Sequence, residues 1–485
     1  MSVFASVLGL VLLAGAGVTM ILTGLPVFVV LIMATLLGLA IDLLSGSVDG
    51  ALIAALPGRL TNVLDNDLLQ ALPLFVLMGV LLEKLPLTGN LFSLAMRAAP
   101  KGTAGPLFAG LGLGALLGPM NGSVGASVLA LNRAIAPRLE QAGLSPALTQ
   151  GLIAAAATLG VVVPPSLVLI LLGDAMLQAH TIALNITGRS ERIINTQDLL
   201  RGALVPAGLA LGAMAVAAFI LARKVRLTTM PSLPLTRRAM MAALIALVAL
   251  VSLLGAVALG KLYAVEAAAT GALALFIVAL LSGFLDRPRL LATLNETLAT
   301  TGALFALLVA ATGFTLMLRI FGTDRLVSDF LTSLPGGPTV TLAIVLVIIA
   351  LSALVLDAFE IIFVIIPIVA PPLLVKVNDP VWASVAILLA LQASFLLPPF
   401  GYALMMTRAV ARVPLSLKAL LRPVSYFLAA ELVVLLLVLA SPNLVHVLDP
   451  PGARDRGTKL LTPDELKKNL DGLAVPEAPP VDLKF

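Results

Sequence analysis

Two stretches that each contain a proline pair decide the fold: Thr158-Leu-Gly-Val-Val-Val-Pro-Pro-Ser166 and Ser394-Phe-Leu-Leu-Pro-Pro-Phe-Gly401. Each lies in an apolar segment long enough to cross a membrane. A proline pair removes two backbone donors and clashes with the preceding turn, so it interrupts a helix. In hydrocarbon the freed carbonyl groups need partners, so such a break must be buried in protein or line a wet cavity. Two matching breaks in two halves of one chain are typical of a transporter's binding site.

The composition predicts a polytopic membrane protein. Of the 485 residues, 60% are hydrophobic and only 11% are charged, whereas a soluble domain carries about 25% charged residues. The apolar runs, such as 3–23 and 239–259, are continuous and lack the alternation of a membrane β-barrel. We therefore expect an all-α polytopic protein.

Several other bulk features exclude function classes. The chain has no cysteine, and its two histidines, His180 and His446, are far apart in the sequence, which argues against a thiolate or histidine metal site. The net charge of +5 does not indicate nucleic-acid binding, because cytoplasmic loops of membrane proteins are rich in Lys and Arg. A nucleophile–base set is not apparent, so we expect no enzyme.

Four apolar arms are too short to span a membrane and are predicted to form two re-entrant hairpins. The arms cover 105–119, 124–137, 339–356 and 361–375, and they are 14 to 18 residues long, against the roughly 20 that a crossing helix needs. Full spans are expected near 3–23, 26–44, 68–83, 147–178 (broken), 201–222, 239–259, 262–284, 297–320, 380–410 (broken) and 421–441.

The spacing of these features predicts an internal repeat. From Gly122, in the first hairpin turn, to Pro164 is 42 residues, and from Asp357, in the second, to Pro398 is 41. The basic segments 223–238 and 408–422 are both predicted to be cytoplasmic. After the first break, the chain needs one more span to reach the cytoplasmic segment 223–238. After the second break, it reaches the cytoplasmic segment 408–422 directly. The two halves therefore have opposite orientations, which predicts inverted repeats.

This organisation divides the chain into five segments. They are N-terminal spans and connector (1–67), repeat 1 (68–222), linking spans (223–296), repeat 2 (297–441) and a flexible extracytoplasmic tail (442–485).

The chemistry of the breaks suggests ions and anions as ligands. A half-helix that begins after a proline pair presents its positive N-terminal end to an anion, and exposed carbonyls suit a hard cation such as Na⁺. Asp357 and Glu360 lie in the second hairpin turn, and intramembrane carboxylates often mark ion pathways. Helix capping is the structural alternative for both acids. Arg319 ends a span and is predicted to reach the interface, with binding of a substrate carboxylate as the alternative.

Several motifs resemble the large membrane subunit of TRAP (tripartite ATP-independent periplasmic) transporters. They are Gly-x-Met-x-Gly-Ser at 118–123, Thr-Leu-Gly-Val-Val-Val-Pro-Pro-Ser at 158–166, Leu-Gly-Asp at 172–174, Ile-Pro-Ile-Val-Ala-Pro-Pro at 366–372, Leu-Gln-Ala-Ser-Phe-Leu-Leu-Pro-Pro-Phe-Gly at 391–401 and Pro-Leu-Phe-Val-Leu-Met-Gly-Val-Leu-Leu-Glu at 73–83. The resemblance covers roughly residues 10–440. Two motif variants, Gln-Ala-Ser-Phe at 392–395 and Leu-Asp-x-x-Glu at 356–360, are similar to the branch of this family associated with 2-oxo acids, lactate-like acids, or mannitol and chloroaromatic compounds.

The resemblance implies Na⁺-coupled symport of a small organic anion by an elevator movement in the bacterial inner membrane. It implies a small membrane subunit and an extracytoplasmic binding protein as partners, and no cofactor beyond the coupling ion. The implied Na⁺ ligands are Asn121, Gly122, Ser123, Thr158 and Gly160 for one site, and Asp357, Gln392, Ser394 and Gly401 for the other. The implied substrate-binding or gating residues are Gly125, Ser127, Pro164, Pro165, Ser166, Glu360, Pro398 and Pro399.

Two positions depart from the family pattern at the second break. Leu397 stands where the family usually has Thr, and Ala390 stands where Asn is common. The second cation site is therefore expected to be weaker, rebuilt or proton-coupled. A stand-alone Na⁺- or H⁺-coupled carboxylate symporter of related hairpin architecture remains the alternative, although its Ser-Asn-Thr hairpin tips do not occur here.

Overall fold

The computed structural model describes residues 3–449, apart from 46–53, 55, 66, 86, 101, 121–122, 190, 226–235, 282 and 284. All regular structure within these residues is helical, as predicted. The helices are α1 (Val3–Thr23), α2 (Val27–Ser45), α4 (Leu56–Leu64), α5 (Asp67–Gln70), α6 (Leu72–Lys84), α7 (Leu87–Ala98), α8 (Ala104–Leu117), η1 (Gly118–Met120), α9 (Val124–Gln141), α10 (Pro146–Val162), α11 (Leu167–Thr187), α12 (Thr196–Ala222), α13 (Arg237–Ala258), α14 (Ala264–Leu281), α15 (Arg287–Ile320), α16 (Thr323–Ser333), α17 (Pro338–Ser352), α18 (Ala358–Glu360), η2 (Ile361–Ile365), α19 (Ile366–Lys376), α20 (Pro380–Ser394), α21 (Tyr402–Val410), α22 (Leu417–Ala440) and η3 (Pro442–Val445).

The helix lengths confirm a multi-pass membrane protein. Among the described residues, eight helices are long and apolar enough to cross a membrane. α15 has 34 residues, which corresponds to about 51 Å and exceeds the roughly 30 Å of a hydrocarbon core. Exposed large apolar side chains line α1, α2, α13 and α14, as expected for surfaces that face lipid.

Both predicted helix breaks are present. The first lies between α10 and α11, at 163–166, and the second between α20 and α21, at 395–401. The Pro164–Pro165 and Pro398–Pro399 peptide bonds are both cis. Each helix before a break begins with an N-cap side chain and a proline, Ser145 before Pro146 and Asp379 before Pro380, an arrangement that starts a helix well.

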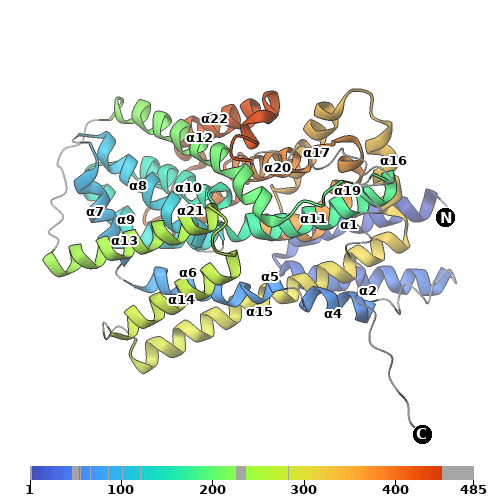
Figure 1. The fold of residues 1–485 in the computed structure, drawn as a ribbon, viewed down its shortest axis with the longest axis horizontal. Coiled ribbons are helices and arrows are strands. Elements are labelled where there is room, and N and C mark those ends of the chain that lie inside the picture. Colours follow the sequence, from blue (N-terminus) through green and yellow to red (C-terminus); the bar gives the residue numbers. More distant parts are fainter. Residues whose placement is uncertain are drawn as a thin grey trace, which may run out of the picture.

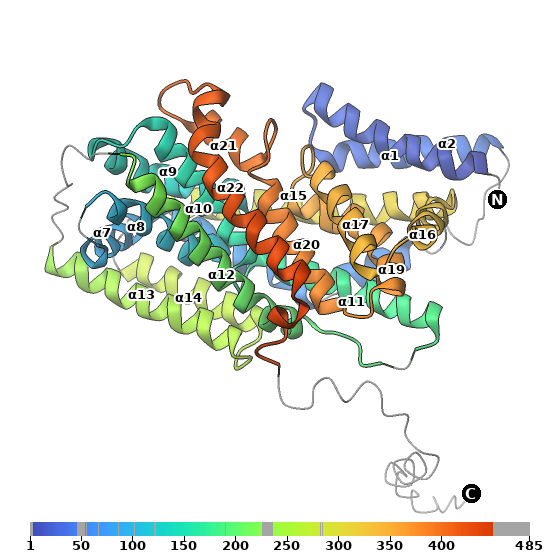
Figure 2. The ribbon, with the colours of Figure 1, turned by 90° about the horizontal axis from the view of Figure 1, so that it is seen from above.

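The helices that precede the breaks form the centre of the molecule. α10 packs against α8, α9 and α22, and α20 packs against α17 and α22. From Leu148 to Val162 every side chain of α10 is buried. Figures 1 and 2 show α10 and α20 inside the bundle, with α22 crossing beside them and the pairs α1–α2 and α13–α14 on the outside.

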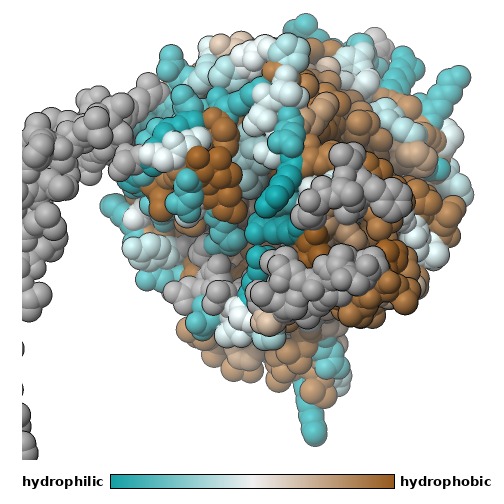
Figure 3. Space-filling view, turned by 90° about the vertical axis from the view of Figure 1, so that its right-hand side faces the viewer, coloured by the Kyte–Doolittle hydropathy of each residue, from teal (hydrophilic) through white to brown (hydrophobic). Residues whose placement is uncertain are grey.

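Three helices of 9 to 12 residues were not predicted from the sequence: α4, α7 and α16. They are amphipathic rather than continuously apolar, so a search for long hydrophobic runs misses them. α15 also begins at Arg287, ten residues before the predicted span at 297. Figure 3 faces the end of the molecule near α1, α2 and α16, where a strip of hydrophilic residues runs between apolar surfaces.

The re-entrant hairpins, the inverted-repeat relation and the five segment boundaries remain predictions. The arm predicted at 361–375 lies in the helical segment Ala358–Lys376, which at 19 residues is long and apolar enough to cross a membrane. Residues 226–235, within the basic loop at 223–238, and residues 450–485 of the tail lie outside the described residues. Within the described part of the tail, Pro442–Val445 form the short helix η3.

Candidate functional site

The first hairpin turn lies directly against the helix before the first break. A Cβ atom added to Gly160 would lie 2.6 Å from the carbonyl carbon of Gly118 and 2.7 Å from its oxygen. Only glycine at both positions allows the two backbones to approach this closely. Gly118, at the start of η1, and the end of α10 before the first break are therefore parts of one site.

The first break leaves oxygen atoms available. Pro164 and Pro165 have no N–H to give to the carbonyl groups of Gly160 and Val161 four residues earlier, and no other backbone donor in the described chain replaces them. The hydroxyl of Ser166, just after the break, is buried and has no hydrogen-bond partner among the described residues. Unpaired oxygens in a buried site are the ligands that a hard cation requires.

The second break is closed by its own hydrogen bonds. The N–H of Gly401 donates to the Leu397 carbonyl at 2.8 Å, and the N–H of Ala403 donates to the Phe395 carbonyl at 3.1 Å. The Ser394 hydroxyl donates to a carbonyl one turn earlier at 2.5 Å. A Cβ atom on Gly401 would lie 2.6 Å from the Phe395 oxygen, so this loop requires glycine there. The two breaks are thus chemically different.

Both hairpin turns cap the second arm of their hairpin. Ser123 accepts a hydrogen bond from the N–H of Ala126 at 3.1 Å, at the start of α9. Asp357 accepts from the N–H of Glu360 at 3.0 Å, and the Glu360 carboxyl accepts from the N–H of Asp357 at 2.8 Å, at the start of α18. These contacts form a reciprocal capping box. Asp357 and Glu360 therefore cap a helix, which is the alternative role that the sequence analysis gave them. Ser127 donates back to the Ser123 carbonyl at 3.0 Å.

Tyr402 connects the two hairpin turns. A Cβ atom on Gly125, in the first hairpin, would lie 2.7 Å from the Tyr402 hydroxyl. The same tyrosine is close enough to Asp357 and Glu360, in the second hairpin, to experience their charge. It follows the second break directly, and its ring packs edge-on against Phe395 with a centroid separation of 6.1 Å. Tyr402, which the sequence analysis did not select, therefore lies near the start of α9, the second hairpin turn and the second break.

Thr158 and Gln392, assigned to different cation sites from the sequence, share a partner. The Thr158 hydroxyl lies 2.8 Å from Glu431 Oε1, a residue of α22. The Gln392 amide lies near the same carboxyl, but neither of its polar atoms forms a hydrogen bond with a described group. Glu431 was missed, yet it is the only charged residue between 423 and 441, and an intramembrane acid is a recognisable signal.

A cavity of about 390 Å³ lies between α15 and α4 on one side and α11, η2 and α19 on the other. Arg59 and Arg319 line it and are close enough for their charges to repel. Neither arginine forms an ion pair with a described residue. The polar lining also includes Asp174 and Gln178, and the Gln178 amide donates to the Asp174 carboxylate at 2.9 Å. Two half-buried guanidinium groups in one hollow suit an anion.

The remaining predicted residues fall in two groups. Asn121 and Gly122 lie outside the described residues. Pro164, Pro165, Pro398 and Pro399 form the breaks themselves. The assignment of individual residues as ion or substrate ligands remains a prediction.

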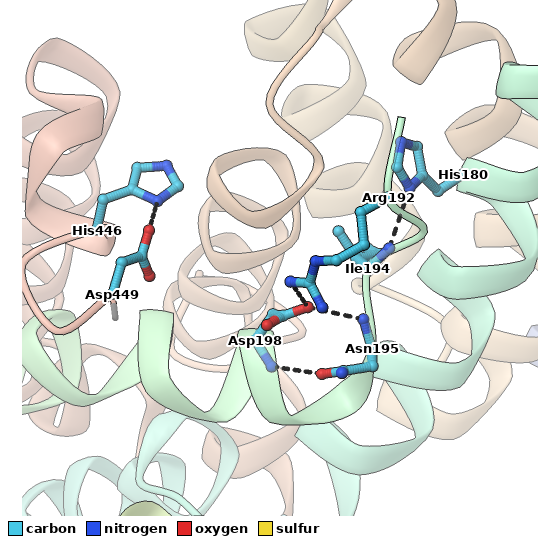
Figure 4. A network of polar contacts seen from close by, with 7 residues as sticks. All are labelled: His180, Arg192, Ile194, Asn195, Asp198, His446 and Asp449. Carbon is cyan, nitrogen blue, oxygen red and sulfur yellow. Dashed lines mark hydrogen bonds and ion pairs between the residues drawn. The ribbon is translucent and has the colours of Figure 1, made fainter. Parts of the chain in front are cut away.

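The two histidines lie in a separate polar region at the ends of α11, α12 and η3. His180 accepts from the N–H of Ile194 at 3.3 Å, and Arg192 pairs with Asp198 at 2.6 Å. His446 contacts Asp449 at 2.7 Å (Figure 4). Both histidines line one hollow of about 690 Å³. Within the described ranges, no group of three His, Cys, Asp or Glu side chains could hold a metal ion.

Comparisons with known proteins agree with this architecture. A family model described as "Tripartite ATP-independent periplasmic transporter, DctM component" matches residues 14–444. The sialic acid TRAP transporter large permease protein SiaM of Vibrio cholerae is 25% identical over 395 residues, covering 79% of this chain and 87% of that protein. The C4-dicarboxylate TRAP transporter large permease protein DctM of Pseudomonas aeruginosa is 26% identical over 406 residues, covering 80% and 88%.

A solved structure shares the fold. The YdaH transporter of Alcanivorax borkumensis, described as having an unusual topology, superposes with a TM-score of 0.61 at 17% identity, covering 80% of this chain and 88% of that one. The fold and the comparisons together define a multi-pass helical permease, a transporter and not an enzyme. The chain belongs to the family of DctM components, the large permease subunits of TRAP transporters, because the family model spans most of its length.

Proposed function

We propose that this chain is the large subunit of a binding-protein-dependent transporter that takes up a small organic anion by Na⁺ symport. The family and the relatives named for sialic acid and C4-dicarboxylates support transport of organic acids. The proposal includes a small membrane subunit, an extracytoplasmic binding protein and a location in the bacterial inner membrane.

The observation that carries the anion proposal is the cavity with Arg59 and Arg319. A carboxylate there would receive charge-assisted hydrogen bonds, which are stronger than neutral ones. The cavity lies between the long helix α15 and the elements α11 and α19, which belong to the broken-helix and hairpin region. An elevator movement of that region along α15 would move the α11 and α19 side of the cavity past the two arginines, which lie on α4 and α15.

The observation that supports cation coupling is the set of oxygens at the first break. The carbonyls of Gly160 and Val161 and the hydroxyl of Ser166 have no donor in the described chain, and Ser123 lies in the adjoining hairpin turn. We assign Na⁺ to this site. The second site would use Asp357 with Ser394 and Gly401, and would be weaker because the second break satisfies its own carbonyls.

The anion proposal is tested with Arg319→Gln and Arg59→Gln. Loss of one charge-assisted hydrogen bond costs about 1.5–3 kcal/mol, which corresponds to about 10- to 150-fold weaker binding. Arg325→Gln on the neighbouring α16 is the matched control, since Arg325 is exposed and does not line the cavity. The measurement is the carboxylate concentration that protects each purified protein from thermal unfolding. If the carboxylate protects all three variants equally, the anion does not bind in this cavity.

The coupling proposal is tested in proteoliposomes that hold both membrane subunits, with the binding protein outside. Uptake of labelled acids should follow an imposed Na⁺ gradient and stop when choline replaces Na⁺ at fixed pH. Asp357→Asn keeps a capping oxygen and removes the charge, so it should raise the Na⁺ concentration for half-maximal uptake. Full uptake in choline driven by a proton gradient would show that the coupling ion is H⁺ and not Na⁺. Uptake without the small subunit and the binding protein would favour the stand-alone symporter.

A further inference from the structure

Glu431 is a carboxyl group buried at the junction of the two broken helices. Glu431 is 1% exposed, while Thr158 on α10 and Gln392 on α20 are 0% exposed. Thr158 and Gln392 each lie six residues before a proline pair, at Pro164 and Pro398 respectively. One side chain of α22 therefore contacts the first halves of both broken helices.

No opposite charge compensates this carboxyl within the described chain. α22 packs against α10, α12, α20 and η3. α10, α20 and η3 contain no charged residue, and α12 carries only Asp198 and Arg201, near its start. On α22 itself the other titratable groups are Lys418, Arg422 and Tyr426, while Asp379 and His446 lie just beyond the ends of α20 and η3. A buried, uncompensated carboxylate costs several kcal/mol.

The hydrogen bonds around this carboxyl leave several polar atoms without a partner. The Thr158 hydroxyl lies 2.8 Å from the Ala155 carbonyl and 2.8 Å from Glu431 Oε1. A hydroxyl carries one hydrogen, so it satisfies only one of these oxygens. Glu431 Oε2 and both polar atoms of Gln392 have no hydrogen-bond partner among the described residues. The unpaired oxygens of Glu431 and Gln392 are therefore available as ligands for a positive charge.

We propose that Glu431, Thr158 and Gln392 form a binding site for one positive charge, supplied by Na⁺ or by a proton. Na⁺ would take the carboxylate, hydroxyl and amide oxygens as ligands, whereas a proton would turn Glu431 into a donor to Thr158 or Gln392. Either source neutralises the carboxyl and joins α10, α20 and α22. This site differs from the oxygens at the first break and does not depend on the anion cavity.

The test compares the wild-type protein with Glu431→Gln in Na⁺ and in choline at fixed pH, without anion or binding protein. Glutamine has the same shape, needs no bound charge and can donate to Thr158, so the variant should fold in choline. Glu296→Gln is the control, because Glu296 is exposed and pairs with Lys84 at 2.7 Å. If Glu431→Gln does not fold, Glu431→Asp keeps the charge but moves the carboxyl back by one methylene, and it should weaken the Na⁺ response or shift the infrared band rather than remove it.

Two readouts distinguish the sources of the charge. A Na⁺ site predicts that Na⁺ raises the melting temperature of the wild type and the control more than that of Glu431→Gln. A proton site predicts an infrared band of a buried carboxylic acid in the wild type and the control, in both salts, that Glu431→Gln lacks. Equal Na⁺ responses together with no difference in this band would overturn the proposal.

Discussion

At the scale of single residues, the site depends on positions where backbone meets backbone. Gly118 and Gly160 approach so closely that neither position has room for a methyl group. Other glycines of the same chain have open space, as Gly212 has in the middle of α12. The same residue type thus has opposite roles, and only the neighbours distinguish them.

Gly160→Ala should destabilise the protein by about 1–3 kcal/mol or more, because overpacking against backbone is difficult to relieve. Gly212→Ala should instead be neutral or stabilising by about 0.5–1 kcal/mol, because alanine favours a helix. Thermal unfolding and the yield of monodisperse protein compare the two. Equal melting temperatures would mean that the first hairpin turn does not press against α10.

At the scale of elements, short polar contacts fix where the helices begin. Asp379 illustrates this: its Oδ1 accepts from the N–H of Trp382 at 2.9 Å, and its Oδ2 contacts His446 Nε2 at 2.7 Å. The start of α20 is thereby tied to the chain that follows α22. The hydrogen bond to Asp379 raises the pKa of His446, with a smaller contribution from Asp449.

This contact predicts a pH-dependent stability. Since the folded pKa of His446 is raised, protonated His446 stabilises the folded state fully below its ordinary pKa of about 6.5. The contribution is lost as the pH rises through the raised value. The gap in melting temperature between wild type and His446→Gln should therefore shrink with rising pH.

Asp379→Asn provides the comparison for this prediction. Asparagine keeps the N-cap oxygen but removes the charge that His446 contacts. Most of the pH dependence of the gap should then disappear. A gap that is constant with pH in the wild-type background would show that the charge of His446 does not contribute.

At the scale of the whole molecule, the distribution of charge predicts the orientation in the membrane. The loop between α21 and α22 is basic, and the segment after α22 is predicted to lie outside. Val413 and Val447 are 52% and 60% exposed, so each offers an accessible place for a single cysteine in a chain that has none.

An impermeant thiol reagent should label Val447→Cys in intact cells with a permeabilised outer membrane, and should not label Val413→Cys. Positive loops are retained in the cytoplasm, which is the physical reason. Both variants should react once the inner membrane is opened, which verifies that each thiol is accessible. Labelling of Val413→Cys from outside would contradict the inverted-repeat topology.

The sequence by itself determined the class of protein and both helix breaks. These follow from local chemistry, since hydrophobic length sets a span and proline removes a donor wherever it stands. The helices α4, α7 and α16 were not predicted from the sequence, because they are amphipathic and contain no long apolar run. Only the tertiary structure brought Tyr402 between the hairpin turns, Glu431 between Thr158 and Gln392, and Arg59 beside Arg319. The contact between Thr158 and Glu431 alone joins residues 273 positions apart, and no local rule fixes which helices pack together.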